Sequence, residues 1–369
     1  MNSFLVPGDG PYLLTHSVGC LPRVAYEALE SNFMGPWAAH GGNAWPDWLQ
    51  QVDGFRAALA QLFGGSPAEY CPQANLSSGL SKLLAALPAS PAGKRTLLAA
   101  EDSFPSLGFV LQQAGRLGFT ARFIPRTQLP DDIHTWSEAL TPDVRVALVT
   151  HVHSNTGRVA PVEEIARLCT AREILCVVDV AQSAGILPMN FPALGADVVL
   201  GSCIKWLCGG PGAGYLWIRG GLIEKLEPVD VGWFSHDDPF QMDIHSFRYA
   251  KDARRFWGGT PSIAPFVIAA ASLRHIHALG VAEIHAQNRR LIQAFRDALP
   301  APWRTRLPAW PIGGTLCIAL GADHEAVTGA LEAAGIQFDS RGDVIRMSFH
   351  ACNATDDAVR VAQAWQGGR

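Results

Sequence analysis

The chain has 369 residues, of which 48% are hydrophobic and 17% charged, and its formal net charge is −4. This composition is typical of a globular protein with a large core, and it excludes a disordered chain. The sequence contains no Lys/Arg block and no apolar run of 18 residues or more. We therefore expect neither nucleic acid nor a membrane as a partner.

The eight cysteines and twelve histidines are scattered along the chain, and no CxxC pair occurs. This spacing predicts reduced thiols in a cytoplasmic protein, because disulfides are rare in that compartment. His151 and His153 form an HxH pair. Two candidate ligands do not make a metal centre, so we expect no metal. The opening stretch, MNSFLVPGDG, lacks the pattern of a secretory signal.

Residues 1–45 carry many Gly, Pro and Trp residues and one helical pattern, near 22–34. We interpret them as an N-terminal arm. Large aromatic side chains favour burial, so Trp37, Trp45 and Trp48 are expected to pack against the rest of the chain.

Short apolar runs then alternate with helical patterns. Strands are expected at 96–100, 119–125, 144–152, 174–180, 196–202 and 212–219. Runs of apolar and β-branched residues without alternation are typical of strands that are buried on both faces. The order of strands and helices therefore predicts a large α/β domain over 46–235, a three-layer sandwich around a mainly parallel sheet.

The C-terminal third has a different pattern. Residues 261–299 are predicted to form one long helical stretch, with Pro265 as the candidate position of a kink. Two strands at 315–321 and 343–349 each precede a helix. This order predicts a smaller α+β domain, which we assign to 236–369.

Two chemically reactive side chains follow predicted strands. Asp179 comes at the end of ILCVVDV, and Lys205 comes just after ADVVLGS. Ligands of open α/β sheets bind at the carboxyl edge of the strands, so both side chains can reach one ligand. Pyridoxal phosphate suits this pair, because a lysine bonds to its aldehyde and a carboxylate keeps its ring nitrogen protonated. A helix cap remains the alternative for Asp179.

A candidate anion site lies in AEYCPQANLSSGLSKLL, residues 68–84. Asn75, Ser77, Ser78 and Gly79 stand at the start of a helical pattern, where free N–H groups and the helix dipole attract a phosphate. An ordinary helix cap is the alternative interpretation.

Several segments in order resemble kynureninases, which belong to the class V aminotransferase superfamily of pyridoxal-phosphate enzymes. They are YLLTHSVGCLP (12–22), EDSFPS (101–106), DVAQ (179–182), GSCIKWLCGGPGAG (201–214), VGWFSHDDPFQMD (231–243), FWGGTP (256–261) and FDSRGDVIRMS (338–348). The resemblance spans about residues 12 to 350 and implies the fold of type I pyridoxal-phosphate transferases.

The resemblance also implies roles for single residues. Lys205 would hold the cofactor covalently, Asp179 would pair with its ring nitrogen, and Phe104 would stack on its ring. Leu76 and Ser77 would bind the phosphate. Roles at the edges of the site fall to four further residues: Gln182 at the ring hydroxyl, Arg346 at the substrate carboxylate, and Trp233 and Thr260 at the phosphate of a neighbouring subunit.

The last pair implies a homodimer with shared sites. His40, in AAHGGNAW, is a candidate substrate contact. Plain alternatives stay open for single residues: core packing for Phe104 and Trp233, a surface ion pair for Arg346, and a lone surface histidine for His40.

Departures from the kynureninase pattern surround the expected cofactor. Gln182 replaces a histidine, Ile204 a tyrosine, Leu107 an aspartate and Cys208 an asparagine. The resemblance predicts an enzyme that hydrolyses the Cβ–Cγ bond of a small amino-acid substrate, as kynureninases do. The alternatives are a class V aminotransferase or C–S lyase, and a degenerate protein that binds the cofactor without turnover. A cysteine desulfurase is disfavoured, because residues 335–346 contain no cysteine.

Overall fold

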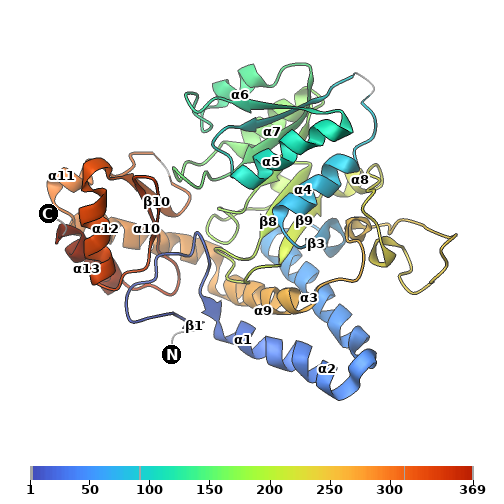
Figure 1. Ribbon diagram of the computed structural model, residues 1–369, viewed down its shortest axis with the longest axis horizontal. Coiled ribbons are helices and arrows are strands. Elements are labelled where there is room, and N and C mark those ends of the chain that lie inside the picture. Colours follow the sequence, from blue (N-terminus) through green and yellow to red (C-terminus); the bar gives the residue numbers. More distant parts are fainter. Residues whose placement is uncertain (1–2, 91–92, 311, 368–369) are drawn as a thin grey trace.

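The structure is a computed structural model that describes residues 3–90, 93–310 and 312–367. Its largest element is a seven-stranded sheet (Figure 1). The strands are β3 (Tyr70–Gln73), β4 (Thr96–Ala100), β5 (Thr120–Ile124), β6 (Val144–Thr150), β7 (Leu175–Asp179), β8 (Val198–Ser202) and β9 (Gly214–Ile218). Their order is β3-β9-β8-β7-β6-β4-β5, and only the pairings of β9 are antiparallel. The expected mainly parallel sheet is confirmed.

Helices cover both faces of this sheet. They include α3 (Trp45–Phe63), α4 (Leu76–Ala85), α5 (Pro105–Gln113), α6 (Ile133–Ala139), α7 (Val162–Ala171) and the short α8 (Gly220–Ile223). Successive strand residues point to opposite faces. Val177 accordingly packs in the cluster formed with α4 and α5, whereas Val178 packs in the cluster formed with α3 and α7. The three-layer α/β sandwich predicted from the apolar strands is therefore confirmed.

A smaller unit stands beside the large sheet and has its own apolar cluster. Its sheet has the order β10-β12-β11 and is antiparallel throughout. Its elements are β10 (Thr315–Ala319), β11 (Asp339–Arg341), β12 (Val344–Ser348), α10 (Val281–Ala298), α11 (Ala301–Arg304), α12 (His324–Ala333) and α13 (Thr355–Gln366). Figure 1 shows this unit next to the carboxyl edge of the large sheet. The domain limits 1–45, 46–235 and 236–369 stay predictions.

The helix expected over 261–299 is broken. Helix α9 (Ala264–Leu279) ends at Gly280, and α10 starts at Val281 after a bend of 72°. Gly280 has a φ of +81°, which a residue with a Cβ adopts only with strain. The prediction of one helix was wrong because the apolar pattern continues across the break. Among the described residues no single helix is long and apolar enough to span a membrane, and this bent pair passes such a test only jointly.

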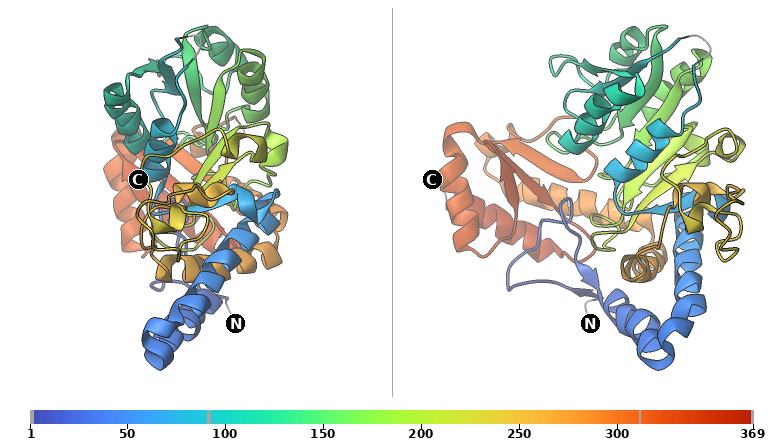
Figure 2. Two further views of the ribbon diagram at one scale, coloured as in Figure 1. Left: turned by 90° about the vertical axis from the view of Figure 1, so that its right-hand side faces the viewer. Right: turned by 45° about the vertical axis from the view of Figure 1, so that its right-hand side comes forward.

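The N-terminal arm projects from the molecule (Figure 2). It consists of β1 (Phe4–Leu5), β2 (Leu21–Pro22), α1 (Arg23–Leu29), a π-helical turn and α2 (Gly35–His40). Trp45 and Trp48 are partly buried, but Trp37 is 57% exposed. The expected burial of Trp37 was wrong, because α2 lies at the tip of the projection, away from both sheets.

Candidate active site

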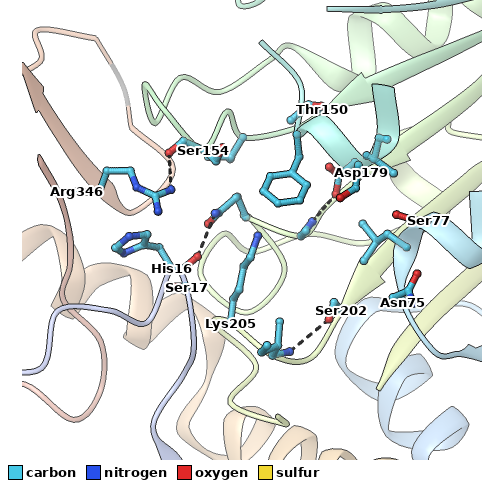
Figure 3. A pocket seen from close by; sticks show the side chains of 18 of the residues that line it. His16, Ser17, Asn75, Ser77, Thr150, Ser154, Asp179, Ser202, Lys205 and Arg346 are labelled. Carbon is cyan, nitrogen blue, oxygen red and sulfur yellow. Dashed lines mark hydrogen bonds between the residues drawn. The ribbon is translucent and has the colours of Figure 1, made fainter. Parts of the chain in front are cut away.

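A cavity of about 670 Å³ lies at the carboxyl ends of β6, β7 and β8, where the small unit and residues 16–17 close it. Seven residues predicted for the site line this cavity: Leu76, Ser77, Phe104, Asp179, Gln182, Lys205 and Arg346. Figure 3 shows Lys205 between Arg346 and His16 on one side and Asp179, Ser77 and Asn75 on the other. Residues from five separate stretches of the sequence thus meet at one place, as the predicted sheet edge requires.

Lys205 lies in the connection between β8 and β9. The N–H of Cys208 donates to the Lys205 carbonyl at 2.9 Å, and the N–H of Gly19 donates to the Ile204 carbonyl at 2.8 Å. A Cβ added at Gly19 would lie 2.2 Å from the Lys205 carbonyl oxygen, so only glycine permits this approach. Burial lowers the pKa of Lys205 to about 8, although Asp179 acts in the opposite direction. A neutral amine, which is a nucleophile, is therefore accessible near neutral pH.

Asp179 is the last residue of β7 and is 4% exposed. Burial raises the pKa of its carboxyl group, while the Ala181 N–H and the charge of Lys205 oppose this shift. The Ala181 N–H donates to Oδ1 at 2.8 Å. Asp179 does not cap a helix, because the next α-helix after β7 is α8, which begins at Gly220. The carboxylate instead faces the cavity.

The N-terminus of α4 forms the opposite end of the cavity. Asn75 is the cap residue, and its Oδ1 accepts the Ser78 N–H at 2.9 Å. The N–H groups of Leu76 and Ser77 belong to the first turn and have no partner within the helix. Together with the Ser77 hydroxyl they suit a phosphate group. The side chain of Asn75 is an ordinary cap, so both interpretations of this stretch hold at once.

Arg346 is 3% exposed and forms a two-pronged ion pair with Asp339. The two residues are cross-strand partners on β11 and β12. His16 Nε2 lies 3.0 Å from Asp339 Oδ1, the oxygen that also accepts the Arg346 Nε–H. Burial opposes ionisation of Asp339, but contacts with His16 and Arg346 outweigh it and lower its pKa to about 2. Arg346 is therefore a buried, oriented guanidinium and not a surface ion pair.

Phe104 and Gln182 also line the cavity. The Phe104 ring is 40% exposed, and its centroid lies 5.7 Å from Lys205 Nζ. The Gln182 amide is fixed at both ends, since its Nε2 donates to the His16 carbonyl at 3.1 Å and its Oε1 accepts Trp206 Nε1–H at 3.4 Å. Phe104 is thus not a core residue, and it is free to stack on a flat ring.

Three predicted site residues do not line this cavity. His40 ends α2, is exposed, and lies near Asp47 at 3.4 Å. Trp233 contacts Trp45 and Phe240, and Thr260 is exposed. The sequence reasoning in turn missed His16, Ser154 and Arg341, which do line it. A signal existed for two of them, because His16 and Arg341 lie inside the segments that resemble kynureninases.

His151 and His153 point away from the cavity, because Thr150, Val152 and Ser154 take the alternate positions that line it. His153 Nδ1 lies 3.0 Å from Asp102 Oδ1. Across the described residues no group of three or more His, Cys, Asp or Glu side chains is placed to hold a metal ion.

The donors present fit pyridoxal phosphate. The cavity offers a buried amine, a buried carboxylate, an exposed aromatic ring and a helix N-terminus. These groups match the aldehyde, the ring nitrogen, the ring face and the phosphate of that cofactor. Fold and site together define a pyridoxal-phosphate-dependent enzyme of fold type I.

The chain belongs to the class-V aminotransferase family, whose sequence model matches residues 50–364. It is 34% identical over 268 residues to a kynureninase of Deinococcus radiodurans, a match that covers 70% of this chain but only 64% of that relative. It is 29% identical to the isopenicillin N epimerase of Streptomyces clavuligerus over 95% of this chain and 93% of that one.

Among solved structures, a cystine C–S lyase in complex with its product cysteine persulfide has a TM-score of 0.83. The two chains are 24% identical, and the match covers 98% of this chain and 99% of the lyase. This likeness shows the fold. The family membership confirms that the chain is a pyridoxal-phosphate-dependent enzyme, as predicted from the sequence.

Proposed function

We propose that the protein hydrolyses the Cβ–Cγ bond of an amino acid whose side chain carries a γ-carbonyl group, as kynureninases do. The observation that carries this proposal is the meeting of Lys205, Asp179 and Arg346 in one cavity, in a chain that is 34% identical to a kynureninase. The segments that resemble kynureninases supply each of these three residues.

When bound, pyridoxal phosphate supplies an electron sink for bonds that break at or next to the substrate α-carbon. The Lys205 amine would anchor the cofactor and, once a substrate amine had taken its place, would be free to take the α-proton; its pKa of about 8 suits a base near neutral pH. Asp179 would keep the ring nitrogen protonated, and Arg346 would orient the substrate carboxylate. The Leu76 and Ser77 N–H groups would hold the phosphate.

A class V aminotransferase or C–S lyase is the second candidate. Gln182 favours it, because its amide is held by the His16 carbonyl and Trp206 where kynureninases carry a histidine. Ile204 and Leu107 also line the cavity, and they replace a tyrosine and an aspartate of the kynureninase pattern. No cysteine is among the described residues that line the cavity, which argues against a desulfurase that forms a persulfide on its own chain.

The experiment is to incubate the purified holoenzyme with kynurenine, with 3-hydroxykynurenine, and with a 2-oxo acid plus an amino-acid panel. Release of an anthranilate supports the hydrolase. Stoichiometric transfer of the amino group to the oxo acid, without anthranilate, moves the function to an aminotransferase. Sulfide or persulfide release from cystine assigns the C–S lyase.

We further propose that the enzyme is a cytoplasmic homodimer whose subunits share their sites. All eight cysteines are free thiols, which suits a reducing compartment. Trp233 adjoins an exposed apolar stretch that includes Phe240, Met242 and Ile244, with exposed fractions of 53%, 70% and 89%. Such a patch marks an interface. A second copy is the fitting occupant, because the phosphate end of each cavity has no cationic side chain of its own chain among the described lining residues.

A further inference from the structure

The cavity contains two arginines that differ in how their charge is compensated. Arg346 is paired with Asp339 through both Nε and Nη2. Arg341 is partly buried, and no carboxylate of the described residues lies within ion-pair distance of it. Its Nη1 donates only to neutral groups, to Asn155 Oδ1 at 2.8 Å and to Ser154 Oγ at 3.2 Å.

Both arginines converge on the same lining residue. Arg346 Nη1 donates to the Ser154 carbonyl at 3.2 Å, while Arg341 Nη1 donates to the hydroxyl of the same serine. Their strands explain this, because β11 carries Arg341 and its neighbour β12 carries Arg346. The guanidinium carbon of Arg341 lies 5.7 Å from the centroid of the Phe104 ring, which is also the distance from Lys205 Nζ to that centroid. Arg341 therefore faces the space where a substrate attached to the cofactor lies.

One of the two arginines that face this space has no carboxylate partner. Asp339 neutralises Arg346, whose remaining outer N–H groups can orient a carboxylate but bring no net charge. Asp179 would be matched by the protonated ring nitrogen of the cofactor. Of the two arginines that line the cavity, Arg341 is the one with no carboxylate within ion-pair distance, and Asp339, which acts on it from further away, is already paired with Arg346. An amino acid held through its nitrogen brings one free anion, its α-carboxylate.

We propose that Arg341 is the counter-charge of the substrate carboxylate and, together with Arg346, clamps it from two sides. Arg341 is thereby the residue that restricts the enzyme to amino acids with a free carboxylate and excludes the corresponding amides. The proposal rests on the amino-acid substrate of the proposed function, but not on which bond is cleaved.

The test compares L-alanine with L-alaninamide, and glycine with glycinamide, as ligands of the holoenzyme. Displacement of Lys205 changes the visible absorption of the cofactor, so a titration gives a dissociation constant without turnover. We expect the wild type to bind the carboxylates more tightly than the amides by about tenfold to a hundredfold, the usual strength of a charge-assisted hydrogen bond. In Arg341→Gln this preference falls to within about threefold. Arg341→Lys keeps the positive charge, so this variant should retain most of the preference for carboxylates.

Arg304→Gln is the matched control. Arg304 lies on α11, outside the cavity lining, and like Arg341 it donates to a neutral group, here the Leu299 carbonyl. It should leave the preference unchanged. Selective protection of Arg341 from butanedione by L-alanine, but not by L-alaninamide, provides a second readout by mass spectrometry.

A wild-type preference that survives in Arg341→Gln and disappears only in Arg346→Gln would overturn the proposal. Equal weakening of carboxylates and amides by Arg341→Gln would also overturn it, because that pattern reports a structural role. A protein that behaves as expected here but releases no anthranilate would contradict the proposed hydrolysis and leave the role of Arg341 intact.

Discussion

Lys205 is buried, although its amine would be charged in water and burial disfavours a charge. Its neighbours explain how the chain tolerates it. Asp179 favours the charged form, burial favours the neutral one, and burial is the larger effect. Cys208, three residues on, has a φ of +53°. Asparagine adopts this left-handed backbone more easily than most residues, which explains the asparagine of the kynureninase pattern at this position.

Replacement of Lys205 by alanine should remove both the covalent anchor and the base. We expect turnover of any substrate to fall by at least about a thousandfold. Borohydride reduction of the holoenzyme, followed by mass spectrometry, should find the cofactor fixed to residue 205 in the wild type and nowhere in the variant. Lys251→Ala, at an exposed position, is the control. Full activity of Lys205→Ala would refute the assignment of the site.

The lowered pKa of Lys205 predicts how cofactor uptake depends on pH. Only the neutral amine attacks the aldehyde, so the rate of covalent uptake by the apoprotein should rise with pH and level off above about 8. Stopped-flow absorbance measures this rate. In Asp179→Asn the midpoint should move to lower pH, because the carboxylate favours the protonated amine. A midpoint near 10.5, the ordinary value for lysine, would contradict the effect of burial.

At the scale of elements, the break between α9 and α10 decides where the small unit stands. Gly280→Ala forces a Cβ into the left-handed region and should lower the free energy of unfolding by about 1 kcal/mol or more. Urea unfolding measures the change. Gly329→Ala is a matched substitution inside α12, at an exposed position with open space around it. It should instead raise the free energy of unfolding by about 0.5–1 kcal/mol. Equal effects of the two substitutions would show that Gly280 is not required for the bend.

How well an element could be predicted from the sequence depended largely on its length. Strands β4 and β6 to β9 were predictable, because buried strands leave continuous apolar runs that flanking polar turns delimit. The edge strand β5 was also predicted, although only its last residue is buried. Strands β3 and β11 have four and three residues, too few to show a period. The helix break was missed because one glycine costs only about 1 kcal/mol in a helix and does not interrupt the apolar pattern.

Within the site, Lys205 and Asp179 were predictable because Asp179 ends one strand of the sheet and Lys205 lies shortly after another. Ser154 and Arg341 were not, since they are 187 positions apart and meet only when the small unit lies against the large sheet. Sequence periodicity carries no information about such a contact. Their roles depend on an arrangement of charges that exists only in the folded chain.

At the scale of the whole molecule, the shared site of a dimer can be tested by complementation. Lys205→Ala removes one half of a site, and the double variant Trp233→Ala, Thr260→Ala should weaken the half that a partner supplies. Mixed after unfolding and refolding together, the two proteins should gain about a quarter of the wild-type activity above the average of the separate variants if both are close to inactive, because half of the dimers are mixed and one of their two sites is intact. No recovery, with dimers present by sedimentation, would mean that each chain completes its own site.

Part of the N-terminal segment pairs with residues that lie more than 300 positions further along the chain. Tyr12 and Leu14 bridge to Gln337 and Ser348, and Gly19 then hydrogen-bonds to the loop that carries Lys205. These contacts have very high contact order, so they form late during folding. During synthesis, residues 12–19 therefore emerge long before residues 337–348, with which they pair. The loop that carries Lys205 is thus held by a segment that reaches its final place only after residues 337–348 have been made.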